Sequence, residues 1–170
     1  MENLPASINM KLNATYKGLI TGFMMVLIST YFGVKHDLAN PLMFATFVIY
    51  IVGVMWTLLS FSLTTGNDGK FMTLFGEGFK CFVIVTLLMV IFWWIYLKLN
   101  PQEIEQGIEA GKKMMQQQGN YTPAEIEAQA IEKRKHALTV LISFNVLKYL
   151  ILGTLITIFG TLLIPKRKKN

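Results

Sequence analysis

The chain has 170 residues, of which 53% are apolar and only 15% charged, and its mean hydropathy of +0.46 is high for a water-soluble protein. The net charge of +6 does not indicate nucleic-acid binding, because the basic residues flank apolar stretches and gather in a tail, as is typical beside an anionic membrane surface. The single cysteine, Cys81, excludes an internal disulfide and a cysteine-only metal cluster, and we expect it to be a buried thiol.

Four stretches of at least 17 residues contain no charged side chain. Crossing a hydrocarbon core takes about 20 mostly apolar residues, so each stretch predicts one membrane span. The predicted spans cover about 14–34, 41–63, 78–98 and 137–164 of a single integral membrane domain, 1–170. The expected fold class is all-α: a four-helix transmembrane bundle with an extramembrane αα-hairpin between helices 3 and 4. No cleavage pattern follows the first span, so we expect it to remain as an anchor.

The first span carries Gly18 and Gly22, whose spacing of four residues lets a neighbouring helix approach closely. As a dimerisation signal this pair is weak, so we favour helix packing within the chain. The second span starts after Pro41 and contains no charged residue. The aromatic and basic stretch 71–80 that follows it is expected to be a short segment lying in the headgroup region.

The third span ends in Trp93, Trp94, Tyr96 and Lys98. Aromatic rings followed by a lysine are favoured at a membrane–water boundary. An aromatic ligand-binding box is the alternative, but it is far less common than an interfacial belt. We therefore expect the span to leave the membrane at this point.

The polar segment of about 100–136 is predicted to form the αα-hairpin. Asn100 followed by Pro101, and Thr122 followed by Pro123, are typical helix starts with a capping residue. From Lys98 to Lys135 there are six acidic and six basic residues, so the hairpin is well solvated and nearly neutral. Its apolar stripes are thin, and such a helix pair would be marginal alone in water. We therefore expect it to dock on the rest of the protein or on a partner.

The fourth span ends at Ile164 and contains Lys148, which we take as the only charged residue inside a span. An intramembrane charge often marks a functional site. Lys148 lies three residues from the expected boundary at Asn145, however, so we favour a side chain that reaches the headgroups. A polar cavity lined by Lys148, Asn145 and Ser143, with an ion or substrate role, is the alternative.

No catalytic constellation or cofactor motif is present in the sequence, so we expect neither an enzyme nor a cofactor. His36 and His136 would lie on the same side of the membrane, but their spacing does not support a metal site. Glu77 near Lys80 is more simply a solvated residue at a helix start. The spans lack charged residues at mid-depth, which disfavours ion-coupled transport.

Four spans place both termini on the same side of the membrane. If the termini are cytoplasmic, eight basic residues lie inside and seven outside, which does not decide the orientation. The dense basic tail at 166–169, directly beside a span, favours cytoplasmic termini. The hairpin would then be extracytoplasmic.

Several of these features together resemble one protein family: the glycines of the first span, residues 75–80 (FGEGFK), residues 95–101 (IYLKLNP), the hairpin and the basic tail. It is a family of small four-span bacterial membrane proteins, widespread in Bacteroidota, called domain of unknown function 4199. The similarity covers nearly the whole chain, and its motifs describe architecture more than chemistry. The resemblance implies the inner membrane of a Gram-negative bacterium and gives no residue a role.

The leading functional hypothesis is a non-enzymatic integral inner-membrane protein with a structural, scaffolding or partner-docking role. Its hairpin and glycine face would serve self-association or docking to another envelope protein. The alternative is a small homo-oligomeric channel or carrier for an uncharged or lipid-like solute. A membrane-embedded enzyme comes third.

Overall fold

A computed structural model describes residues 13–35, 41–64 and 70–164, which contain helices and no strand. The helices are α1 (Ala14–Val34), the 3-10 helix η1 (Pro41–Met43), α2 (Phe44–Ser62), α3 (Phe71–Leu99), α4 (Pro101–Gln118) and α5 (Pro123–Leu163). The predicted all-α fold class is confirmed. Four segments are long and apolar enough to cross a membrane: α1, η1 with α2, α3 and α5. They indicate a multi-pass membrane protein.

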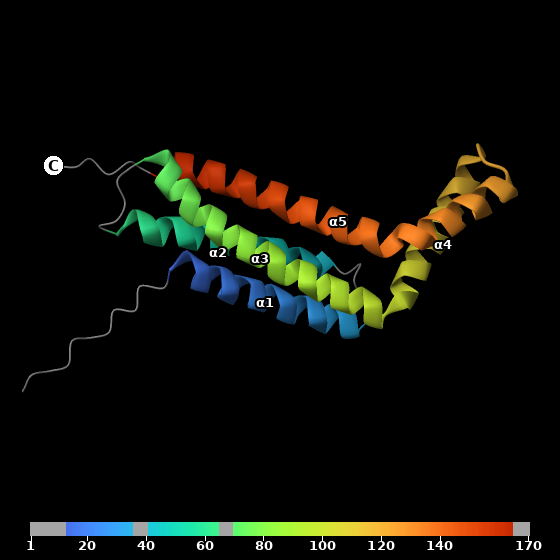
Figure 1. Cartoon of the computed structure of the whole chain (residues 1–170), viewed down its shortest axis with the longest axis horizontal. Helices are drawn as coiled ribbons and strands as arrows, with labels where there is room; N and C mark the ends of the chain where they lie inside the picture. Colours follow the sequence, from blue (N-terminus) through green and yellow to red (C-terminus); the bar gives the residue numbers. More distant parts are fainter. Residues whose placement is uncertain (1–12, 36–40, 65–69, 165–170) are drawn as a thin grey trace, which may run out of the picture.

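Helices α1, α2, α3 and α5 run side by side as an elongated bundle (Figure 1). Helices α2 and α3 contact each other, and each of them also contacts α1 and α5. In the described part of the chain α1 and α5 do not meet. The bundle therefore has a diamond-shaped cross-section, in which α2 and α3 form the short diagonal.

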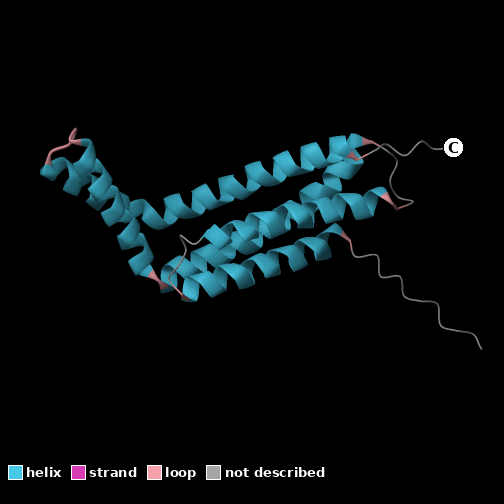
Figure 2. Ribbon diagram, turned by 180° about the vertical axis from the view of Figure 1, so that it is seen from behind, coloured by secondary structure: helices cyan, strands magenta, loops and turns pink. Residues whose placement is uncertain are grey.

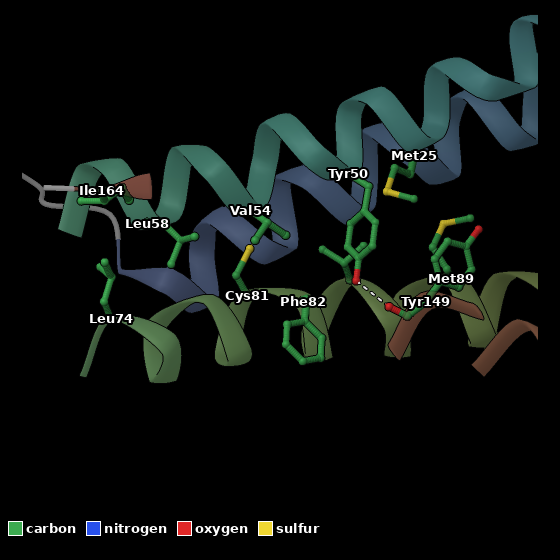
Figure 3. Packing of buried hydrophobic residues seen from close by; sticks show 11 residues of the cluster. Met25, Tyr50, Val54, Leu58, Leu74, Cys81, Phe82, Met89, Tyr149 and Ile164 are labelled. Atoms are coloured by element: carbon green, nitrogen blue, oxygen red, sulfur yellow. Dashed lines mark hydrogen bonds between the residues drawn. The ribbon is translucent and has the colours of Figure 1, made fainter. Parts of the chain in front are cut away.

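Large side chains from all four bundle helices fill the interior (Figure 3). The fully buried ones include Met25, Tyr50, Leu58, Phe82 and Met89. Many other apolar side chains point outward, with exposed fractions between 36% and 80%. Because lipid tails are as apolar as these side chains, a bilayer accommodates this surface without the cost that water would impose.

Glycines bring the backbones of the bundle helices into close contact. A Cβ atom on Gly78 would lie 2.5 Å from Thr157 Cγ2, and one on Gly160 would lie 2.6 Å from Leu58 Cδ1. Similar clashes would arise at Gly33, Gly53 and Gly153. In the absence of a hydrophobic driving force between helices in lipid, such close packing supplies much of the association energy.

Helix α3 begins at Phe71, earlier than predicted. The stretch 71–80 is the first part of this 29-residue helix and not a separate interfacial segment. No proline interrupts it, and Gly78 is retained inside the helix because it packs closely against Thr157 of α5. At about 1.5 Å per residue α3 is about 44 Å long, which exceeds a hydrocarbon core of about 30 Å.

The predicted start signals of the hairpin helices had different outcomes. Thr122 forms the predicted capping box, because its Oγ1 accepts from the Glu125 backbone N–H (3.3 Å) and its own N–H donates to Glu125 Oε2 (2.7 Å). Asn100 holds the N-cap position of α4, but the predicted capping by its side chain is wrong. Only this residue separates α3 from α4, and its Nδ2 donates to the carbonyl of Tyr96 (2.9 Å), which closes the end of α3 instead.

The hairpin consists of α4 and the first part of α5, and it projects beyond the end of the bundle (Figure 2). Helix α5 has 41 residues and continues from the hairpin into the bundle without a break. Helix α4 contacts only α5 and the end of α3 within the described residues. Docking of the hairpin onto the bundle of its own chain is therefore not observed. Its thin apolar stripe (Ile108, Met115, Ile126 and Ala130) is buried between its own two helices.

Candidate functional site

Lys148 lies on α5, where it is half-buried and already has partners. Its Nζ donates to Asn145 Oδ1 at 2.8 Å and lies 4.6 Å from the ring centroid of Tyr149 and 5.7 Å from that of Phe47. Asn145 is buried and donates its own Nδ2 to the carbonyl of Leu141 (2.9 Å). The ammonium is thus held by an amide oxygen and two aromatic faces, an arrangement that stabilises a cation in a partly desolvated position.

Ser143 does not join this group. Its side chain is exposed, whereas Asn145 is buried. The residues are two apart on one helix, and such positions do not face each other. The three polar residues singled out from the sequence therefore comprise one contacting pair, Lys148 with Asn145, and one separate hydroxyl.

Next to Lys148, a tyrosine pair joins α2 to α5. The buried Tyr50 hydroxyl donates to the backbone carbonyl of Tyr149 at 2.9 Å (Figure 3). The two rings meet edge to face with their centroids 5.9 Å apart. The contact satisfies a buried hydroxyl and fixes the two helices relative to each other.

Gly18 and Gly22 face α3 of the same chain. A Cβ on Gly18 would lie 2.8 Å from the carbonyl oxygen of Cys81, and one on Gly22 would lie 2.6 Å from Leu88 Cδ1. Both positions are thus occupied by an intrachain helix contact. Cys81 itself is a free, fully buried thiol, as predicted.

Lys148 is not the only charged residue inside a candidate span: Lys17 lies within α1, and α3 contains Glu77, Lys80 and Lys98. Lys17 lies in the first turn of α1 and is 6% exposed. Its Nζ lies 5.5 Å from the ring centroid of Trp56. The sequence pattern predicts a flanking residue here, because Lys17 borders the charge-free stretch 18–34. The sequence feature that indicates its burial is its position directly beside Gly18, on the face of α1 that carries small residues.

Lys17 and Glu77 line a pocket of about 680 Å³ at the end of the bundle opposite the hairpin. Glu77 pairs with the exposed Lys80, whose Nζ lies 2.7 Å from its Oε1. The interpretation of Glu77 as a solvated residue at a helix start is wrong, because Glu77 lies inside α3, its side chain is only 19% exposed, and it borders the pocket. The pocket combines one buried cation with hydroxyl and aromatic side chains.

Ion pairs connect α4 to the first part of α5 in the hairpin. Arg134 donates from Nε and Nη2 to both carboxylate oxygens of Glu105, at 2.8 and 2.6 Å. Lys112 lies 2.8 Å from Glu127 Oε2 and 3.1 Å from Glu109 Oε1. The hydrogen bonds from Arg134 lower the pKa of Glu105, and those from Lys112 lower the pKa of Glu127.

The hairpin is therefore expected to be less stable at acid pH. Because the pKa values of Glu105 and Glu127 are lowered in the folded state, their contribution is complete above the unfolded carboxyl pKa of about 4.3 and is lost as pH falls through the folded values. Amide hydrogen exchange of α4 in lipid nanodiscs, measured from pH 7 to pH 3, should show this loss. In Glu105→Gln combined with Glu127→Gln, the pH dependence should be small. Unchanged acid sensitivity in that variant would contradict the assignment.

A groove of about 360 Å³ lies on the hairpin where it meets the bundle. Its lining is mainly apolar or small and comes from both helices: Ile104, Gly107, Ile108, Gly111, Ala137, Val140 and Leu141. Glu103, Lys133 and His136 provide its polar positions. His136 lies 3.3 Å from Glu132 Oε1.

The metal alternative gains no support from the residues that the structure describes, where no group of three or more His, Cys, Asp or Glu side chains comes together. His36, the proposed companion of His136, lies outside the described residues, as does the basic tail 166–169.

Comparison with known proteins identifies the family. The sequence profile of the family described as "Protein of unknown function (DUF4199)" matches residues 16–166, which include all four apolar segments and the hairpin apart from the first two residues of α1. No curated protein and no solved structure matches the chain. The chain, a bundle of four long apolar helices with a projecting hairpin, belongs to the DUF4199 family.

Proposed function

We propose that this chain is a non-enzymatic integral protein of a bacterial inner membrane that docks another envelope protein in the groove of its hairpin. The termini would be cytoplasmic and the hairpin extracytoplasmic.

The structure of the hairpin supports a role in holding a partner protein at a fixed position relative to the membrane. Because α5 is one continuous helix, the hairpin is a rigid extension of a membrane-spanning helix. At about 1.5 Å per residue its 41 residues extend about 62 Å. The ion pairs of Arg134 and Lys112 hold α4 against it. A partner bound to the hairpin would thus have a fixed position relative to the membrane.

Two glycines in the groove carry the proposal. A Cβ on Gly107 would meet nothing within 4 Å, and one on Gly111 would meet only Lys133 Nζ at 3.9 Å. Each glycine in a helix interior costs about 1 kcal/mol relative to alanine. In the bundle, glycines such as Gly18 allow a close helix contact that explains them. The hairpin glycines have no such contact in the described chain, and close approach of a partner backbone would provide one.

The channel or carrier alternative has less support. Tyr50, Phe82, Met25 and Leu58 are fully buried and fill the centre of the bundle. A path would therefore have to lie between copies of the chain. A symmetric oligomer with such a path is an outcome that the experiment below can reveal.

Photo-crosslinking in cells tests the docking role. A photoreactive amino acid at Val140, which is 61% exposed and lines the groove, should give a discrete adduct with one envelope protein. Gly107→Leu combined with Gly111→Leu should reduce that adduct about tenfold, because each leucine would fill the groove and lose binding energy of order 1 kcal/mol. The same glycine changes should not weaken the hairpin, since leucine favours helix.

Gln117→Leu is the matched control, because Gln117 is an exposed position of α4 outside the groove. It should leave the adduct unchanged. Equal adducts in the glycine double variant and the control, or no adduct at Val140, would contradict docking at this groove. An adduct with a second copy of the chain would favour the oligomer instead.

A further inference from the structure

At the end of the bundle opposite the hairpin, a pocket of about 680 Å³ opens between α1, α2 and α3. Its polar lining residues are Asn13, Lys17, Thr57, Ser60, Thr64 and Glu77. Trp56, Phe61 and Leu63 form its apolar border, and Leu63 is 80% exposed. The pocket is thus open towards the surface that lipid would cover.

Lys17 is the unusual residue of this pocket. It is 6% exposed, and its Nζ has no hydrogen-bond acceptor within residues 13–35, 41–64 and 70–164. The Trp56 ring lies 5.5 Å from Nζ, and Glu77 of the same pocket attracts the ammonium without forming a hydrogen bond to it. Burying an ammonium without a hydrogen-bonded counter-charge is costly, so a ligand that supplies one would stabilise the site.

The first turn of α1 contributes further positive potential. Ala14 and Asn13 line the pocket, and the Asn13 side chain caps only the backbone N–H of Tyr16, at 3.0 Å. The first four N–H groups of a helix lack partners within the helix, and its positive dipole end favours anions. A helix start beside a buried lysine is a suitable position for a phosphate group.

The acidic residue of the pocket does not cancel this potential. Glu77 is paired with Lys80, whose Nζ lies 2.7 Å from its Oε1. Lys17, Lys80 and Glu77 together therefore leave one positive charge. Ser60 adds a half-buried hydroxyl that has no protein partner in the described residues and is free to donate.

We propose that this pocket binds the phosphate group of an anionic membrane phospholipid. Lys17 and the first turn of α1 would contact the phosphate, while the acyl chains would follow the apolar border at Trp56 and Leu63. The position supports lipid over free phosphate, because α1 and α3 begin and α2 ends here, at the depth where headgroups lie. Trp56 is suited to this boundary as well.

Native mass spectrometry of the full chain in mild detergent tests the proposal, with equal amounts of phosphatidylglycerol and phosphatidylcholine added. The wild-type chain should retain phosphatidylglycerol about tenfold over phosphatidylcholine, as expected for one charge-assisted hydrogen-bonded contact. Lys17→Met should abolish the preference, and Lys17→Arg should preserve it. Lys98→Met is the control, since Lys98 lies over Trp94 at the other end of the bundle (4.2 Å) and should not change the preference.

Ser60→Trp, which fills the pocket and keeps Lys17, covers the case in which Lys17→Met fails to fold; it should also abolish the preference. Inorganic phosphate in large excess distinguishes the two sources of the group, and it should not displace the lipid. The proposal is overturned if a folded Lys17→Met or Ser60→Trp variant keeps the preference, or if inorganic phosphate displaces the lipid. Because neither variant touches the hairpin, these results are independent of the docking experiment.

Discussion

Replacing Gly153 by leucine is expected to prevent α5 from packing against α2 and α3. A Cβ at this position would contact the Tyr50 hydroxyl and would lie 2.6 Å from Phe82 Cγ, and both of these side chains are fully buried. Overpacking a dense core costs about 1–3 kcal/mol and sometimes more. We expect a loss of about 3 kcal/mol or more here, because the displaced Tyr50 would also lose its hydrogen bond to Tyr149.

Denaturation of the chain in mild detergent by added sodium dodecyl sulfate, followed by tryptophan fluorescence, measures this loss. Gly76→Leu is the matched control, because a Cβ on Gly76 of α3 would meet nothing within 4 Å. That variant should stay within about 0.5 kcal/mol of the wild type, as substitutions without a new contact usually do. Equal stability of the Gly153 and Gly76 variants would show that α5 does not pack at this position.

Phe82→Ala is expected to destabilise the bundle by about 2 kcal/mol. Large-to-small changes in soluble cores cost about 3–5 kcal/mol for phenylalanine, and part of this cost is transfer from water. In lipid the transfer part is absent and the lost packing remains. Phe82 is 1% exposed and also contacts Phe79 edge to face, with ring centroids 5.1 Å apart.

The two changes should be coupled. Removing the Phe82 ring makes room for a leucine at position 153, so the double variant should be more stable than the sum of the two single losses predicts. A double-mutant cycle measured by the same denaturation gives the coupling, which we expect to be about 1 kcal/mol or more for residues in direct contact. Additive losses would contradict the contact between α3 and α5.

The spans and the hairpin could be predicted from the sequence because each depends on local pattern. Charge-free stretches of sufficient length identify the spans, and Thr122 with Glu125 identifies a helix start. Asn100 shows the limit of this reasoning. Whether it caps the helix after it or closes the helix before it depends on the very short connection between α3 and α4, which residue preferences alone do not reveal.

The candidate sites were harder to predict because they depend on which face of a helix turns inward. A lysine near the end of a helix is normally solvated, and this pattern predicts the same for Lys17. In this bundle, the buried face of α1 contains small and polar residues, including Thr21 and Ser29, while apolar Phe23 faces outward. Lys17 lies on that buried face. The open space around Gly107 could not be predicted either, because the sequence does not show that no neighbour within the described chain approaches this glycine.

Site-directed spin labelling in lipid vesicles tests most directly that lipid surrounds the bundle while the hairpin lies in water. Labels at Leu87→Cys of α3 and Ile151→Cys of α5, both more than half exposed, report on the bundle surface, and Gln117→Cys reports on the hairpin. In a Cys81→Ala background, oxygen should relax the two bundle labels more than a water-soluble nickel complex does, and the order should reverse at residue 117. Efficient relaxation of the bundle labels by nickel would contradict the four-span account.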